Sequence, residues 1–512
     1  MKRIITGDEL KQVKKEAVNT LCDAVASTLG PSGNNVLISN SEVSPFITND
    51  GVTIASNISS TNEAINSIYE IVKEASLKTN EIVGDGTTTT MVLLQEIFNE
   101  GLKEIDSGKN PIVLKEELNK SLVKVLSLIK KLNKSTKTSD LESIASVAAN
   151  SIEIGRFLSE IYLKMKSKYS IKLTEGTKLD TYYRVNYGYD IEIDGLSNMY
   201  FKKTKELKLR NAYILLIKGY LQNLEQISEA VNEALTSNKI LIIFTEDYDE
   251  SIKQELLVYF LNANKNIFII KLPDYASHRE KIETDISTLA SATIKNIDYE
   301  RIYFSDLGVI KNVVIRKEEI ILSIAPSKVK KLVAELQAEV KTCTSEYEKD
   351  FLISRLSKLE NGIATIYVGG NTKTEIREKI MRYEDALCAL EIAKEGVVLG
   401  GGVTLLDVSD KLSINTLGDA ILQKALRSPF ERIAENTGKD GSVIKKEIIH
   451  SKYNKLYNFK DDQYETAEAT KILDPVEVVI SALRNAVSIS SILLTINYLV
   501  VNQNIENEKE VL

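Results

Sequence analysis

The stretch with the clearest chemical potential is residues 84–90, where a Gly-Asp-Gly triplet is followed by four threonines and a helical pattern. Glycines one residue apart permit a tight turn with positive φ, and the N–H groups and hydroxyls of a helix's first turn favour an anion. The Asp85 carboxylate would repel a phosphate unless a divalent cation lay between them. The stretch therefore predicts a site for a metal-bound nucleotide. It is not a Walker P-loop, because no Gly-Lys-Ser/Thr follows, and in isolation its threonines could instead only cap a helix.

Composition limits the chemistry that the other residues can supply. With only two histidines, a histidine base or metal cluster is nearly excluded, so carboxylates, hydroxyls and a metal must do the work. The three cysteines lie far apart and indicate neither a disulfide framework nor a zinc site. A net charge of −7 from residues of mixed sign argues against nucleic acid or a membrane surface as a partner. Because no apolar signal core opens the sequence, we expect a cytoplasmic protein.

Both ends of the chain are predicted to be mainly helical, and 512 residues are enough for two to four domains. Asp50-Gly51 is typical of a tight turn, and the polar run 133–140 of a domain boundary. Apolar residues at helical spacing predict helices over 8–29, 62–79, 87–105 and 112–132, two more within 140–168, and mainly helix from 375 onward with a break at 400–402.

The middle of the chain is predicted to alternate between β-strands and α-helices. The strands are expected at 212–217, 239–244 and 266–271, and the helices at 223–235 and 250–261. This alternation predicts a βαβ layer in a distinct α/β domain. A long helical region, 326–361, and a strand, 364–368, follow. The apolar stretch 486–501 is interrupted by polar residues and is shorter than the roughly 20 residues that span a bilayer, so we expect a core helix and strand and no membrane segment.

The two helices of this middle layer carry more apolar side chains than one buried face requires. Two interpretations remain open. Both helices could simply pack on the sheet, or they could border a groove that binds apolar polypeptide.

Six short motifs, taken in order along the chain, resemble the group I chaperonins of the GroEL type. The motifs are Thr28-Leu29-Gly30-Pro31, Asn49-Asp50-Gly51-Val52, Gly84-Asp85-Gly86-Thr87-Thr88-Thr89, Glu384-Asp385-Ala386-Leu387, Glu395-Gly396-Val397-Val398-Leu399-Gly400-Gly401-Gly402 and Ile472-Leu473-Asp474-Pro475. Each motif alone is weak evidence, but their order and spacing match the family from the first helix to about residue 500. The match is dense at both ends and sparse between about 190 and 360.

The resemblance implies a chaperonin fold, a multidomain α+β and α/β protein with three domains. A mainly helical equatorial ATP-binding domain would comprise residues 1–131 and 396–512. A small intermediate hinge domain would comprise 132–187 and 364–395, and an α/β apical substrate-binding domain would comprise 188–363.

The resemblance also implies roles in binding and hydrolysing ATP with Mg²⁺, and K⁺ is a further candidate ion. Asp85 and Asp385 match metal-site carboxylates, and Asp385 and Asp50 match the carboxylates that position the attacking water. The positions matched to nucleotide contacts are Thr28, Leu29, Gly30, Pro31, Asp85, Gly86, Thr87, Thr88, Thr89, Gly401, Asn458, Phe459, Ile472 and Asp474.

In the middle domain the resemblance implies a groove that grips non-native polypeptides and a small lid co-chaperonin, with the subunits assembled in a homo-oligomeric ring. The matched positions are Tyr200, Phe201, Ile227, Val231, Leu257 and Val258.

One departure from the family's pattern bears directly on activity. Position 49, where the family usually has a lysine near the phosphates, is Asn49. Fewer positive charges should weaken nucleotide binding or slow turnover. The alternative to a folding ATPase is therefore a ring-forming scaffold or holdase that binds nucleotide weakly without a productive cycle. Retention of all three aspartates, Asp50, Asp85 and Asp385, favours the ATPase.

Overall fold

The computed structural model describes residues 2–39, 45–166, 170–186, 188–202, 204–263, 265–273, 276–343, 345–467 and 469–502. The chain divides into two compact units. The first comprises Met1–Lys164, Leu173–Thr181 and Tyr367–Leu512, and the second comprises Met165–Lys172 and Tyr182–Ile366. The first unit therefore combines the two ends of the chain.

Helices dominate the first unit. In order they are α1 (Gly7–Ala26), α2 (Gly51–Asn57), α3 (Glu63–Val83), α4 (Thr87–Asp106), α5 (Pro111–Leu132), α6 (Leu141–Ala148), α7 (Ile152–Met165), α13 (Lys373–Ile392), α14 (Val403–Lys411), α15 (Leu417–Ala425), α16 (Ser428–Asn436), α17 (Gly441–His450) and α18 (Val476–Thr495). Its paired strands are β1 (Lys2–Thr6) with β18 (Tyr498–Asn502), β2 (Val36–Ile38) with β3 (Phe46–Thr48), β14 (Val397–Leu399) with β17 (Leu473–Pro475), and β15 (Lys455–Asn458) with β16 (Gln463–Thr466).

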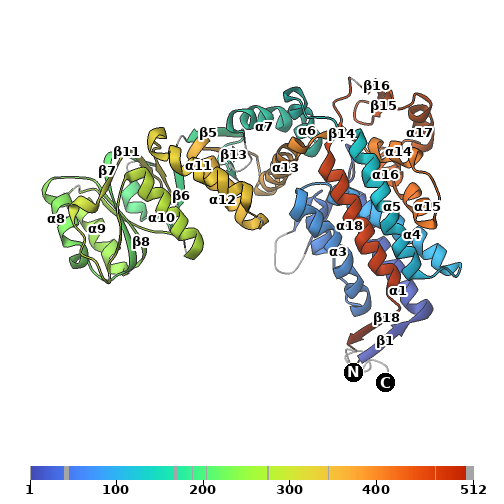
Figure 1. Ribbon diagram of the computed structural model, residues 1–512, viewed down its shortest axis with the longest axis horizontal. Helices are drawn as coiled ribbons and strands as arrows, with labels where there is room; N and C mark the ends of the chain where they lie inside the picture. The colour runs from blue at the N-terminus through green and yellow to red at the C-terminus, as the bar shows by residue number, and fades with distance from the viewer. Residues whose placement is uncertain are drawn as a thin grey trace. The chain divides into compact units, whose positions relative to one another are not determined.

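The core of this unit forms around α18, which contacts α3, α4 and α5 (Figure 1). Leu483, Ala486 and Leu493 of α18 are fully buried together with Leu94 and Phe98 of α4. α18 is long and apolar enough to cross a membrane by length and composition, but 78% of its most apolar window is buried inside the unit. This agrees with the prediction that the C-terminal apolar stretch is a core helix followed by a strand.

The second unit is organised around a sheet with the strand order β6-β12-β11-β7-β8-β9, and β10 also pairs with β7. β7, β8 and β9 are parallel, with Tyr213 opposite Leu241 and Leu241 opposite Ile267, and this confirms the predicted βαβ layer. The elements are β5 (Tyr182–Asn186), β6 (Tyr189–Glu192), β7 (Leu207–Leu221), α8 (Ser228–Thr236), β8 (Leu241–Tyr248), α9 (Glu250–Ala263), β9 (Ile267–Lys271), α10 (Ala276–Ala290), β10 (Ile294–Asn296), β11 (Gly308–Ile315), β12 (Glu319–Leu322), α11 (Pro326–Thr342) and α12 (Glu346–Asn361). A further sheet has the order β4-β13-β5, where β4 is Ile171–Glu175 and β13 is Ile363–Val368.

Two local predictions differ from the structure. Asp50-Gly51 does not form a hairpin turn but begins α2, because the Asp50 carboxylate accepts hydrogen bonds from the N–H groups of Val52 (3.3 Å) and Thr53 (2.8 Å) and so caps the helix. The long helical region is two helices, α11 and α12, and Ser345 caps the second. The division into three domains remains a prediction.

A buried carboxylate links two helices of the first unit. Asp419 of α15 is fully buried, and its oxygens accept hydrogen bonds from Ser121 (2.6 Å) and Lys124 (2.9 Å) of α5. Although burial alone would raise its pKa, these donors hold the pKa of Asp419 well below its usual value. Its contribution to stability is therefore present above the unfolded pKa near 4 and is lost as the pH falls below it.

We expect Asp419→Ala to lower the free energy of unfolding by about 3 kcal/mol, because it leaves a lysine and a hydroxyl without their partner. Chemical denaturation at pH 7 measures the loss. The control is Glu74→Ala, which removes the exposed Glu74–Lys78 pair (2.8 Å) and should cost far less. Equal losses in the two variants would contradict the assigned role of Asp419.

Candidate functional site

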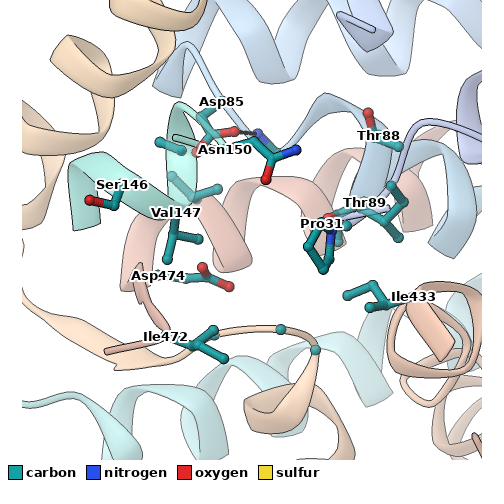
Figure 2. A pocket seen from close by; sticks show the side chains of 18 of the residues that line it. Pro31, Asp85, Thr88, Thr89, Ser146, Val147, Asn150, Ile433, Ile472 and Asp474 are labelled. Atoms are coloured by element: carbon teal, nitrogen blue, oxygen red, sulfur yellow. Dashed lines mark hydrogen bonds between the residues drawn. The ribbon is translucent and has the colours of Figure 1, made fainter. Parts of the chain in front are cut away.

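A cavity of about 670 Å³ opens within the first unit, and the predicted nucleotide motifs line it. Its walls come from the loop after α1, the turn between α3 and α4, the α6–α7 junction, α13, the loop before α14, and the segments around β15 and β17. Figure 2 shows Asp85 and Asp474 projecting into this cavity from different walls, with Pro31, Thr89 and Ile433 on a third side. Motifs that lie some 300 residues apart in the sequence thus meet in one place.

The Gly-Asp-Gly turn sets the position of Asp85. Gly84 ends α3 with φ 62° and Gly86 precedes α4 with φ 78°, both in the left-handed region that favours glycine. A Cβ on Gly86 would lie 2.6 Å from Val478 Cγ1, so α18 leaves no room for a side chain there. The N–H of Gly86 donates to Asp85 Oδ1 (2.5 Å). The carboxylate is therefore fixed beside the N-terminus of α4.

The first turn of α4 faces the start of α2. A Cβ on Gly51 would lie 2.8 Å from Thr87 Oγ1 and 2.7 Å from Thr88 Oγ1. A glycine at position 51 thus leaves space directly above the two hydroxyls. With the unpaired N–H groups of the helix N-terminus, these hydroxyls form a setting suited to a phosphate group.

Three half-buried carboxylates, Asp85, Asp385 and Asp474, line the cavity, and their surroundings do not offset the cost of desolvating their charges. Desolvation raises the pKa of Asp85 to about 6 and, with the charge of Asp85, that of Asp474 to about 7. Desolvation, followed by the charges of Asp85 and Asp50, raises the pKa of Asp385 well above its usual value. Neither Asp385 nor Asp474 accepts a hydrogen bond from any described residue. A cation bound beside these carboxylates would stabilise their ionised forms and lower their pKa values.

A divalent metal fits these donors only together with a ligand. Among the described ranges, no group of three or more His, Cys, Asp or Glu side chains could hold a metal ion by itself. Mg²⁺ is commonly bound by one or two carboxylates, waters and substrate phosphates, which matches a site with separated carboxylates and an anion-binding helix N-terminus. The donor set therefore fits Mg²⁺ bound to a nucleotide better than a resident structural metal.

Asp50 has a structural task in addition to its place in the cavity wall. Both of its carboxylate oxygens accept hydrogen bonds from α2: Oδ1 accepts from the N–H of Val52, and Oδ2 accepts from the N–H and the hydroxyl (2.5 Å) of Thr53. Its charge contributes to the raised pKa of Asp385, so the two carboxylates are electrostatically coupled. The structure thus places Asp50 in the site and explains its residue type partly by helix capping.

The loop after α1 and the segments around β15 and β17 supply the wider part of the cavity. Thr28, Leu29, Gly30, Pro31, Gly401, Asn458, Phe459 and Ile472 all line it. The Thr28 hydroxyl donates to the Val25 carbonyl (2.9 Å), and the Asn458 amide donates to Asp461 and Glu465 (2.8 Å each). These two side chains therefore hold their own loops, while Ile472 and Pro31 offer apolar surface.

No site residue was predicted at the α6–α7 junction, yet Ser146, Val147 and Asn150 line the cavity, as does Arg382 of α13. No sequence signal distinguishes these positions, because an Asn-Ser pair between two helices is typical of an ordinary helix end. Only the packing of α6 against α13 brings them to the site.

The predicted polypeptide-binding residues lie in the second unit and differ in exposure. Tyr200, Ile227 and Val231 are buried in its cores, and Tyr200 contacts the ring of Phe260 (4.8 Å between centroids). Phe201 and Leu257 are half-buried, and Val258 is 51% exposed. α8 packs on the sheet, whereas α9 also presents Val258 and Leu261 at the surface, and the polypeptide-binding groove stays a prediction. The role of these residues in polypeptide binding stays a prediction.

Comparison with known proteins gives a consistent result. The chain matches the TCP-1/cpn60 chaperonin family over residues 21–504. It is also similar to the chaperonin gp146 from the bacteriophage EL 2 (Pseudomonas aeruginosa), crystallised in the presence of ATP-BeFx. The TM-score is 0.71 for one crystal form and 0.65 for another, each at 20% identity over 98% of this chain and 99% of that one. These similarities support the fold described above.

The raised pKa values lead to a prediction about stability. A carboxyl group whose pKa is higher in the folded than in the unfolded state binds more protons when folded, so the ligand-free protein loses stability as the pH rises from about 4 to 7. We expect Asp474→Asn to stabilise the ligand-free protein at pH 8 by about 1–2 kcal/mol, because it removes a desolvated charge.

Chemical denaturation at pH 8 and pH 5 checks this prediction, and the gain should shrink at pH 5. Asp8→Asn, which changes a carboxylate that is 95% exposed, is the control and should have little effect at either pH. A destabilised Asp474→Asn variant at pH 8 would show that the carboxylate is compensated in the folded protein.

Proposed function

This chain belongs to the TCP-1/cpn60 chaperonin family, and we propose that it is an ATP-dependent chaperonin that binds non-native polypeptides in a ring cavity and promotes their folding. The observation that carries the proposal is that Asp85, in the Gly-Asp-Gly turn at the N-terminus of α4, lines one cavity together with two other half-buried carboxylates, Asp385 and Asp474. The crystallisation of gp146 in the presence of ATP-BeFx supports the same ligand class.

The residues of the cavity divide the work of ATP hydrolysis between them. The first turn of α4, with Thr87, Thr88 and Thr89, binds the phosphates through N–H groups and hydroxyls. Asp85 and Asp385 would hold Mg²⁺, which supplies neutralisation of the phosphate charge when bound, and K⁺ is a further candidate ion. The apolar surfaces of Pro31 and Ile472 contact the base.

Asp385 positions the attacking water and accepts its proton. Asp50, held by its hydrogen bonds to α2, lines the same cavity and assists in positioning the water. This division places the catalytic carboxylate on α13 and the phosphate-binding groups on α4, so hydrolysis requires these elements to be together.

The second unit supplies the polypeptide-binding surface in this proposal. Met199, Tyr220, Val258 and Leu261 are all at least 41% exposed and belong to the elements around β7 and α9. Exposed apolar side chains of this kind suit contact with non-native chains. Assembly into a homo-oligomeric ring, closure by a small lid co-chaperonin, the three-domain division and a cytoplasmic location complete the proposal, with neither nucleic acid nor a membrane as a partner.

Asn49 favours a second candidate function. It lines the cavity at a position where a lysine would supply positive charge to a triphosphate. The alternative is a ring-forming scaffold or holdase that binds nucleotide weakly and does not complete a hydrolytic cycle.

We expect Asp385→Ala to abolish steady-state phosphate release from Mg²⁺-ATP while leaving ATP binding largely intact, because the substitution removes the water-positioning carboxylate but none of the α4 phosphate contacts. Glu384→Ala is the matched control, since Glu384 is the exposed carboxylate next to it on α13. Turnover that survives in Asp385→Ala would refute this role. Inactivity of the wild type with preserved nucleotide binding would favour the scaffold.

A further inference from the structure

Asn150, which lines the cavity described above, has an unusual backbone conformation. It lies between α6 and α7 with φ 47°, in the left-handed region that favours glycine. Figure 2 shows its side chain projecting into the cavity on the side of Asp85, away from Ile472. The side chain is half-buried, and no described residue forms a hydrogen bond with its amide.

The backbone conformation has a local explanation, but the side chain does not. The N–H of Asn150 donates to the Val147 carbonyl (3.1 Å), and that of Ser151 donates to the Ser146 carbonyl (3.1 Å), which is the hydrogen-bonding pattern of a helix C-terminus. Glycine is the residue best suited to that position. The helix end therefore explains the positive φ and leaves the Asn150 amide, which glycine would lack, without a structural task.

The helix that precedes Asn150, α6, is packed against α13, the helix that carries Asp385. Ile144 of α6 forms a small buried cluster with Ala389 of α13, together with Ala393 and Val397. α6 also contacts β17, the strand that contains Asp474. One packed pair of helices therefore brings a neutral amide and a carboxylate to the same cavity.

We propose that the Asn150 amide donates a hydrogen bond to the terminal phosphate of bound ATP. The inference rests on the proposed function. An amide suits this task because it donates without adding negative charge to a cavity already lined by Asp50, Asp85, Asp385 and Asp474. Its place on the Asp85 side corresponds to the phosphate end, whereas Ile472 marks the base end. ADP lacks the group that Asn150 contacts, so the contact would distinguish the two nucleotides.

The decisive variant is Asn150→Gly, because a purely structural role and a ligand contact predict opposite results. If Asn150 only ends a helix, glycine keeps or improves stability and leaves activity unchanged. If the amide contacts the terminal phosphate, the variant folds normally but releases phosphate about 10-fold to 100-fold more slowly, the effect typical of losing one preorganised donor. Asn211→Gly is the matched control, with φ 54° at an exposed position of the second unit.

Thermal shift with Mg²⁺-ATP and with Mg²⁺-ADP provides a readout that does not depend on turnover. We expect the wild type and Asn211→Gly to be stabilised more by ATP than by ADP, and this difference to be clearly smaller in Asn150→Gly. Asn150→Asp, which adds a charge beside Asp85, should weaken ATP binding further. Wild-type turnover and an unchanged ATP preference in Asn150→Gly would overturn this inference alone. Absence of any nucleotide-dependent shift in the wild type would overturn both this inference and the proposed function.

Discussion

The mutual repulsion of carboxylates in one cavity is the constraint on which the account of this protein depends. Asp85, Asp385 and Asp474 come from three separate segments, and desolvation by burial is the largest cause of the raised pKa of each. Neighbouring carboxylates add to it: Asp50 acts on Asp85 and on Asp385, and Asp85 acts on Asp385 and on Asp474. Chains fold against such repulsion only when the surrounding structure fixes the groups in place. The free-energy cost of burying these carboxylates together is offset when a cation and a polyanionic ligand bind at the same time.

The scaffold that fixes these groups is the helical core around α18. Val478 of α18 closes the space beside Gly86, so the core directly sets the turn that carries Asp85. The second support is the packing of α6 on α13, which holds Asp385 in place. The core around α18 thus fixes the turn that carries Asp85, and the small buried cluster between α6 and α13 fixes the helix that carries Asp385. This arrangement suits a site in which both elements must meet around a ligand.

Much of this arrangement could be predicted from the sequence, because helical periodicity and glycine pairs act locally. The Gly-Asp-Gly turn, the βαβ layer and the helices of both chain ends follow from patterns of this kind, and the resemblance to chaperonins brought Asp385 and Asp474 to the same site. Asp50 was misjudged as part of a turn because its carboxylate bonds to N–H groups that a pattern does not show. Asn150 was missed because its position depends on tertiary packing, and Tyr200 proved buried because aromatic neighbours distant in sequence cover it.

The measurement that tests the central claim most directly is calorimetric titration of the purified wild-type protein with ATP, with Mg²⁺ present and with Mg²⁺ removed by EDTA. If the carboxylates form a site for a metal-bound nucleotide, ATP binds with one site per chain in Mg²⁺, and the affinity falls steeply in EDTA because the phosphates then meet uncompensated negative charge. Equal affinity in both conditions, or no binding in Mg²⁺, would contradict the account.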